Sequence, residues 1–157
     1  MEMSLEVQEA INKQITVELE SAYLYLSMSL WFGKKEFKNL EKLYFAFSKE
    51  EFEHAMKFTN HITEMGGEAE FSALKKPKSD WNSVKEIVEA TYEHEKFVTG
   101  QIHKIVTLID EKNEYASQSL LGWFVEEQVE EEVKSRLLMK MQAGFKNDWL
   151  FDHRARR

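Results

Sequence analysis

Apolar residues recur at steps of three and four along four long stretches of the chain, which is the spacing of one face of an α-helix. The stretches cover residues 5–32, 37–65, 84–112 and 115–145. In the first stretch, the series assigned to the buried face is Ile11, Ile15, Leu19, Ala22, Leu26 and Leu30. Gly33, the Gly66-Gly67 pair and Asn113 follow the first three stretches, where such residues commonly end helices. The pattern predicts four long helices.

The connections between these helices differ in length. Short turns join the first helix to the second and the third to the fourth, so each pair is expected to be antiparallel. Between the second and third lies a longer segment with the only proline, which ends at Ser83, where Ser83-x-x-Glu86 predicts a capping box. About 17 extended residues span roughly 50 Å, whereas a helix of about 28 residues is about 42 Å long. We therefore predict an all-α four-helix bundle with a long crossover between helices 2 and 3.

Composition agrees with a single helical domain. The chain has 157 residues, one proline and six glycines, which suits long uninterrupted helices. We expect one domain over residues 1–157, with the bundle at about 5–145 and a tail or short fifth helix at about 146–157. No apolar run approaches the roughly 20 residues that cross a bilayer, and the N-terminus lacks a signal-peptide pattern. A cytoplasmic protein without a membrane partner is expected.

Net charge and cysteine content limit the kinds of partner and of metal site that the chain can have. The net charge of -7 argues against a nucleic-acid partner and favours cations near the protein. The chain contains no cysteine, so any metal must be held by oxygen atoms and imidazole nitrogens.

Polar residues interrupt the apolar face of every predicted helix near its middle. They are Glu18 in the first helix, Glu51 and His54 in the second, Glu95 in the third, and Gln128 and Glu131 in the fourth. Taken singly, each acid is best explained as solvated, and the histidine as a satisfied core residue. Taken together, they are expected to meet in one interior layer.

Such a layer needs positive charge. Burying a carboxylate costs several kcal/mol, and a domain is stable by only about 5–15 kcal/mol. No lysine or arginine occupies these inward positions, so a pair of divalent cations bridged by Glu51 is the economical answer. The set also matches a di-iron template, with one Glu from each of two helices and Glu-x-x-His from a third. The fourth helix departs from that template, because Gln128-x-x-Glu131 replaces a second Glu-x-x-His.

The segments VELESAYLYLSM, SKEEFEHAMKF, YEHEKF and WFVEEQVEEE resemble the non-haem ferritins of bacteria and archaea, and the resemblance extends through Gln142. It implies that the first iron of a ferroxidase centre is held by Glu18, Glu51 and His54, and the second by Glu51, Glu95 and Glu131. It implies a third iron site from Glu50, Glu127 and Glu130, with Glu131 shared, and a hydrogen bond from Gln128 near the dioxygen site. Tyr25 and Trp123 match aromatic positions beside the centre that are placed to supply an electron, although core packing is the competing interpretation for both.

Two departures from the wider family bear on cofactor and assembly. Bacterioferritin, the haem-containing relative, has a methionine after the bridging glutamate and a histidine in helix four. This chain has Phe52 and Glu131 there, so no haem is expected. The tail NDWLFDHRARR is shorter and more basic than the family's fifth helix. The resemblance implies a homo-oligomeric shell of 24 subunits, and the short tail leaves smaller assemblies open.

The predicted function is iron storage with ferroxidase activity, in which dioxygen or peroxide oxidises Fe(II) to Fe(III), stored as ferric oxo-hydroxide mineral. Three alternatives stay open. One is a rubrerythrin-like peroxidase, or another di-iron or di-manganese redox protein, although rubrerythrins also carry a cysteine-ligated iron domain. Another is a structural or partner-binding bundle with solvated acids. The last is a DNA-protecting mini-ferritin, which holds its iron at a subunit interface.

Overall fold

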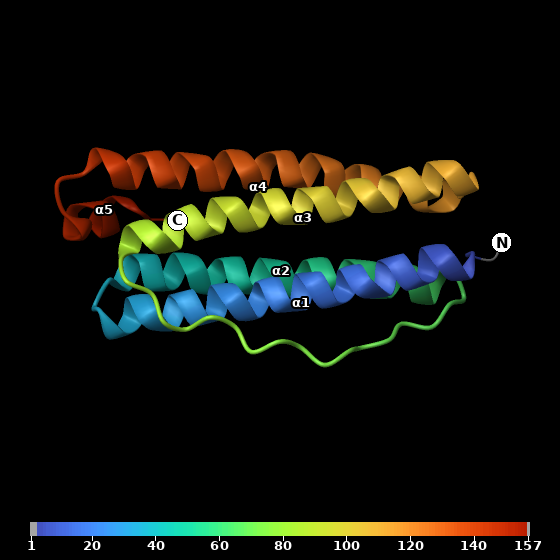
Figure 1. Cartoon of the computed structure of the whole chain (residues 1–157), viewed down its shortest axis with the longest axis horizontal. Helices are drawn as coiled ribbons and strands as arrows, with labels where there is room; N and C mark the ends of the chain where they lie inside the picture. Colours follow the sequence, from blue (N-terminus) through green and yellow to red (C-terminus); the bar gives the residue numbers. More distant parts are fainter. Residues whose placement is uncertain (1–2, 157) are drawn as a thin grey trace.

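The computed structural model describes residues 3–156, which form five α-helices and one short 3-10 helix. These are α1 (Leu5–Lys34), α2 (Lys38–Glu64), α3 (Val84–Lys112), η1 (Tyr115–Ser117), α4 (Gln118–Gly144) and α5 (Asp148–Arg154). The four long helices lie side by side as a bundle, with α2 running back along α1 and α4 back along α3 (Figure 1). The predicted all-α four-helix bundle, with a long crossover between helices 2 and 3 and a short fifth helix, is confirmed. No helix in residues 3–156 is long and apolar enough to cross a membrane.

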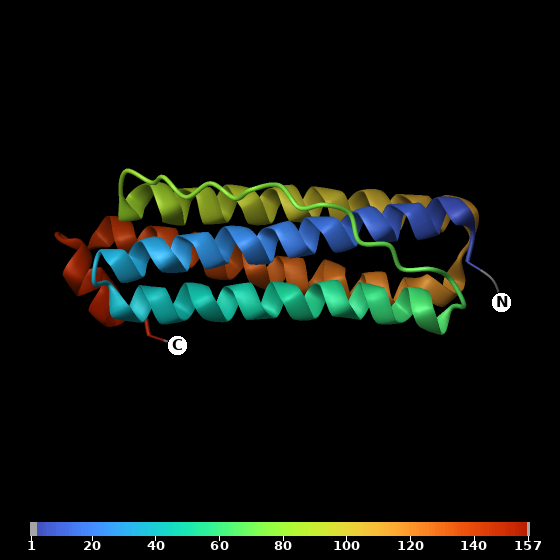
Figure 2. The same ribbon diagram turned by 90° about the horizontal axis from the view of Figure 1, so that it is seen from below.

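The crossover between α2 and α3 runs along the outside of the bundle, beside α1, from one end to the other (Figures 1 and 2). The Asn12 side chain fixes it by donating to the Glu68 carbonyl at 3.0 Å and accepting from the Glu70 amide at 2.8 Å. Ser83 then caps α3, because its Oγ accepts from the Glu86 amide at 3.0 Å. The Glu86 carboxylate accepts from the Asn82 amide instead of the Ser83 amide, so the predicted capping box forms in only one direction.

The buried face of α1 differs from the predicted series at its C-terminal half. Leu26 and Leu30 are 37% and 62% exposed, whereas Tyr25 and Met28 are buried. The predicted series takes five steps over 19 residues, longer on average than the 3.6 residues of a helical turn, and so drifts by about 100° around the helix. The apolar stripe was therefore wrong for these two leucines.

Two apolar clusters fill the bundle, one on each side of its middle. One contains Phe32 and Tyr44 together with Phe151 from α5, and the other contains Ile11 and Phe58. Buried polar side chains lie between them: Gln14, Glu18, Ser21, Glu51, His54, Thr91, Glu95, Gln128, Glu131 and Ser135. The two clusters hold the four helices together on either side of this polar layer.

Candidate metal centre

Three buried side chains from α1 and α2 form the first group of potential metal ligands. They are Glu18, Glu51 and His54, each with a ligand atom within 4.8 Å of the others. His54 Nδ1 lies 3.2 Å from Glu51 Oε2 and 4.0 Å from Glu18 Oε2. Glu51 and His54 are three residues apart on α2, so they share one face of that helix. The antiparallel packing of α1 brings Glu18 beside them.

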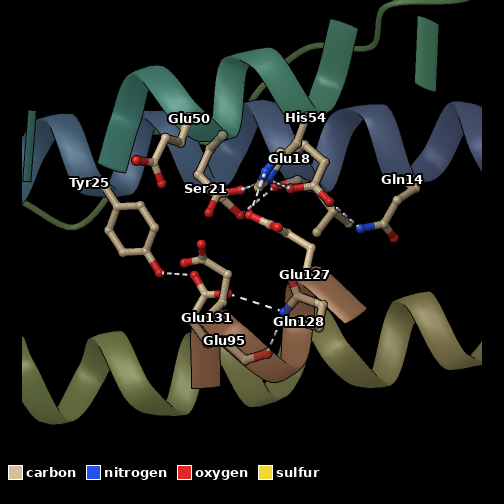
Figure 3. A network of polar contacts seen from close by, with 12 residues as sticks. Gln14, Glu18, Ser21, Tyr25, Glu50, His54, Glu95, Glu127, Gln128 and Glu131 are labelled. Carbon is tan, nitrogen blue, oxygen red and sulfur yellow. Dashed lines mark hydrogen bonds and ion pairs between the residues drawn. The ribbon is translucent and has the colours of Figure 1, made fainter. Parts of the chain in front are cut away.

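A second group joins the two halves of the bundle. It consists of Glu51, Glu95 on α3 and Glu131 on α4, again with ligand atoms within 4.8 Å of one another. Glu51 belongs to both groups, and its role as a bridging ligand stays a prediction. Figure 3 shows the labelled carboxylates of Glu18, Glu95 and Glu131 pointing toward the same interior space. The ligand set is therefore assembled within one chain.

Burial dominates the electrostatics of this layer. Desolvation raises the pKa of Glu18 well above the usual value, and the neighbouring Glu51 carboxylate raises it further. Desolvation likewise raises the pKa values of Glu51, Glu95 and Glu131, and repulsion from Glu95 adds to the rise for Glu51 and Glu131. Without metal, the centre therefore tends to hold protons, and a bound cation would displace them.

Hydrogen bonds fix two of the carboxylates. Gln14 Nε2 donates to Glu18 Oε1 at 3.1 Å, while the other oxygen, Glu18 Oε2, has no hydrogen-bond partner although it is buried. Gln128 Nε2 donates to Glu95 Oε2 at 3.2 Å, and the Tyr25 hydroxyl donates to Glu95 Oε1 (Figure 3). Burial raises the pKa of Tyr25 well above its usual value, so its hydroxyl keeps this proton. An unpartnered buried carboxylate oxygen is the group that a metal ion would satisfy.

Two supporting residues next to the centre were not predicted from the sequence. Ser21 Oγ lies 2.8 Å from the Val17 carbonyl and forms a hydrogen bond with His94 Nε2 at 2.7 Å, so it links the His94 ring to α1. The His94 ring packs edge-on against Tyr25 at 5.8 Å between centroids, and burial lowers the pKa of His94 to about 4. In the sequence, His94 stands directly before the predicted ligand Glu95. This position alone does not show which way the His94 ring faces.

A third unpredicted residue is Lys134, whose ammonium lies 2.9 Å from Glu131 Oε1 and 3.4 Å from Glu50 Oε2. No lysine or arginine was expected at the inward positions. Lys134 is not inward-facing, since its side chain is 42% exposed, but its stem reaches the layer from the rim. The inward positions themselves therefore hold no lysine or arginine in residues 3–156, but a basic side chain does reach one of the acids from outside.

The residues proposed for a third iron site do not lie as close to one another as the members of the two ligand groups do. Within residues 3–156, Glu50, Glu127 and Glu130 form no further cluster of potential ligands. Glu127 Oε1 instead lies 3.5 Å from His54 Nε2, Glu50 pairs with Lys134, and Glu130 is exposed. Their role as ligands stays a prediction.

A cavity of about 420 Å³ between α2 and α4 reaches His54 from the surface. It is lined by Glu50, Glu53, His54, Met56, Lys57, Asn60, Trp123 and Glu127. Lys57 Nζ lies 3.7 Å from the centre of the Trp123 ring, and that ring packs edge-on against His54. Trp123 is 36% exposed, so it borders this cavity and is not part of the closed core. The cavity gives a small cation an acidic approach to the first group.

The donor set of the layer is four carboxylates and one imidazole, which suits iron or manganese, and less typically zinc. A carboxylate shared by two groups can hold two ions close together. Such an arrangement suits two-electron chemistry, in which each metal ion supplies one electron.

Comparison with known proteins agrees with this geometry. Residues 8–142 match the ferritin-like domain family. The chain is 37% identical over 130 residues to a probable bacterial non-haem ferritin-like protein of Haemophilus influenzae, covering 83% of this chain and 79% of that one. It is 35% identical over 134 residues to the bacterial non-haem ferritin of Campylobacter jejuni, covering 85% and 80%. An open-pore ferritin of Archaeoglobus fulgidus superposes with a TM-score of 0.93 at 34% identity, covering 98% of this chain and 97% of that one. The chain therefore belongs to the ferritin family, among its non-haem members.

Proposed function

We propose that the protein stores iron and oxidises it on entry, using the two groups of ligands as a paired Fe(II) site. Glu18, Glu51 and His54 would hold one ion, and Glu51, Glu95 and Glu131 the other. The observation that carries the proposal is the sharing of buried Glu51 between two groups whose ligand atoms each lie within 4.8 Å of one another. Membership of the non-haem ferritins supports iron as the metal.

The reaction moves one electron from each of two Fe(II) ions to one dioxygen molecule. With two protons, dioxygen becomes hydrogen peroxide and both ions become Fe(III). Hard, anionic carboxylate oxygens bind the higher charge of Fe(III) more strongly, which lowers the cost of losing the electron. The Fe(III) product then hydrolyses and joins a ferric oxo-hydroxide mineral.

Neighbouring residues have positioning and proton roles in this proposal. Gln128 and Tyr25 hold the two oxygens of Glu95 in place, which fixes the direction from which that carboxylate meets a metal ion. In this proposal Tyr25 would supply an electron during oxidation. Glu50, Glu127 and Glu130 would receive iron as it leaves the paired site.

The same proposal includes a homo-oligomer with a cavity for the mineral. The family resemblance implies a shell of 24 subunits. Because α5 is short, a smaller assembly is the alternative, and a mass measurement distinguishes the two. Sedimentation with and without iron tests it, because storage requires a closed assembly whereas oxidation does not. The cytoplasmic location expected from the sequence stays a prediction.

Substitution of the shared ligand and the imidazole tests the ferroxidase function. Glu51→Ala and His54→Ala should lower the initial rate of Fe(II) oxidation at least about tenfold, because each removes a ligand from the paired site. The rate is measured by the growth of Fe(III) absorbance, with circular dichroism to show that the helices remain. Glu64→Ala, an exposed acid on α2, is the matched control and should keep the wild-type rate. Wild-type rates in both ligand variants would contradict the proposal.

A further inference from the structure

Lys134 is the one lysine or arginine within ion-pair distance of the second ligand group in residues 3–156. Its ammonium lies 2.9 Å from Glu131 Oε1, 3.4 Å from Glu50 Oε2 and 4.8 Å from the centre of the Phe47 ring. The Glu131 side chain is only 7% exposed, whereas that of Lys134 is 42% exposed. The ammonium therefore pairs with a nearly buried ligand oxygen from a position with access to water.

The charge of Lys134 acts on the second group as a whole. It partly offsets the burial-driven rise in the pKa values of Glu51, Glu95 and Glu131. For Glu18 the corresponding offset comes from His54, and no lysine contributes among the main causes. The two groups thus differ: in the first, one oxygen of Glu18 has no hydrogen-bond partner, whereas in the second the Lys134 ammonium already pairs with Glu131.

We propose that Lys134 is an internal counter-cation that sets the order of metal binding, because an ion entering the second group must displace its ammonium from Glu131. This inference rests on the proposed paired metal site. The first group fills without such competition, so it takes the first ion. The second ion binds more weakly for as long as the ammonium can return to Glu131.

The chemistry of lysine suits this task. Its ammonium is a compact charge on a flexible four-carbon stem, so it can leave one carboxylate oxygen without disturbing the helix that carries it. The partly exposed position allows water to solvate the displaced ammonium, which keeps the cost of displacement moderate. When Fe(III) leaves the second group, the returning ammonium restores the charge balance of Glu131.

Anaerobic titration of the metal-free protein with Fe(II) by isothermal calorimetry tests the inference. In Lys134→Gln, the dissociation constant of the second equivalent should fall about tenfold, because a neutral amide cannot compete for Glu131. The first equivalent should change less than about twofold, because Lys134 pairs with Glu131, which belongs to the second group alone, and acts on the first group only through the shared Glu51.

Two variants control for charge and fold. Lys134→Arg keeps the charge and should keep the separation between the two affinities. Lys140→Gln removes the same charge from an exposed position on the same helix and should leave both equivalents unchanged. Circular dichroism melts of each metal-free variant show whether the bundle remains folded.

Three results would overturn the inference: an unchanged second equivalent in Lys134→Gln, a weaker one, or equal tightening of both equivalents. The last would show a general effect of net charge. If the wild-type protein binds two equivalents and Lys134→Gln matches it, only this inference fails. If the wild-type protein binds no Fe(II) in either group, the proposed function fails with it.

Discussion

Glu18 is a buried acid whose carboxylate is only partly satisfied by hydrogen bonds. Its side chain is fully buried, one carboxylate oxygen has no hydrogen-bond partner, and burial raises its pKa well above the usual value. The same features make Glu18 useful as a ligand, since a metal ion would satisfy the free oxygen. We infer that the buried Glu18 carboxylate lowers the stability of the metal-free protein and at the same time favours metal binding.

Glu18→Gln should therefore stabilise the metal-free protein while impairing the first metal group. At pH 7 the expected gain is about 1–3 kcal/mol, because the amide removes the cost of desolvating or protonating the carboxylate. Urea unfolding measures it, with exposed Glu9→Gln on the same helix as the control. Below about pH 4 the gain should vanish, since the carboxyl is then protonated in the folded and unfolded chains alike. A destabilised Glu18→Gln protein at pH 7 would contradict this account.

Helical periodicity was enough to predict the burial of all six central polar residues. A polar residue that falls between apolar neighbours at 100° per residue has its direction fixed by the helix, as for Glu95 between Thr91 and Val98. Their roles as ligands or hydrogen-bond donors stay predictions. Lys134 could not be found in this way, because a long flexible side chain reaches its partner from a position that the pattern assigns to the surface.

α5 stabilises the start of α2. The residue before α2, Phe37, makes no side-chain capping hydrogen bond. Asp152 supplies one from a distance of more than a hundred residues in sequence, since its Oδ1 accepts from the Leu40 amide at 2.9 Å. A carboxylate at a helix N-terminus also interacts favourably with the helix dipole. The short tail is therefore part of the bundle.

Asp152→Ala should cost about 1–2 kcal/mol of stability, the usual value of a lost N-cap with its charge. Chemical denaturation checks this, with Asp80→Ala in the crossover as an exposed control. Because Asp152 is far from the paired site, Fe(II) binding by the folded variant should be unchanged. A loss below about 0.3 kcal/mol would show that α5 does not cap α2.

Element boundaries and connectivity were accessible from the sequence wherever strong local signals existed. Asn113 adopts a left-handed conformation at φ 55°, as expected of an asparagine that ends a helix, and Ser83 caps α3. The interaction of Asp152 with α2 was not accessible, because it depends on how the chain end folds back over the bundle. Contacts between residues so far apart in sequence do not show in the periodicity of apolar positions.

The bundle as a whole is two apolar cores joined by an anionic layer. Burial of apolar side chains in the two cores stabilises the folded chain. In the absence of metal, the buried acids of the layer lower this stability. Four carboxyls with raised pKa values couple this penalty to pH.

The stability of the metal-free protein should fall as the pH rises from about 5 to 8. Above the usual pKa of a glutamate, the folded state retains more protons on the four buried carboxyls than the unfolded chain does, so raising the pH favours unfolding. Metal replaces those protons, so the loaded protein should show a flatter dependence and should release protons on binding. Scanning calorimetry of both forms at several pH values measures this. A metal-free protein that melts higher at pH 8 than at pH 5 would contradict the assignment.

An anaerobic Fe(II) soak of crystals, read by iron anomalous diffraction, tests the paired site most directly. We expect two iron peaks per chain at mid-bundle, one among Glu18, Glu51 and His54 and one among Glu51, Glu95 and Glu131, with Glu51 between them. In Lys134→Gln the second peak should reach full occupancy at a lower iron concentration. An empty mid-bundle layer at saturating Fe(II), or iron bound only at the surface acids, would contradict the account.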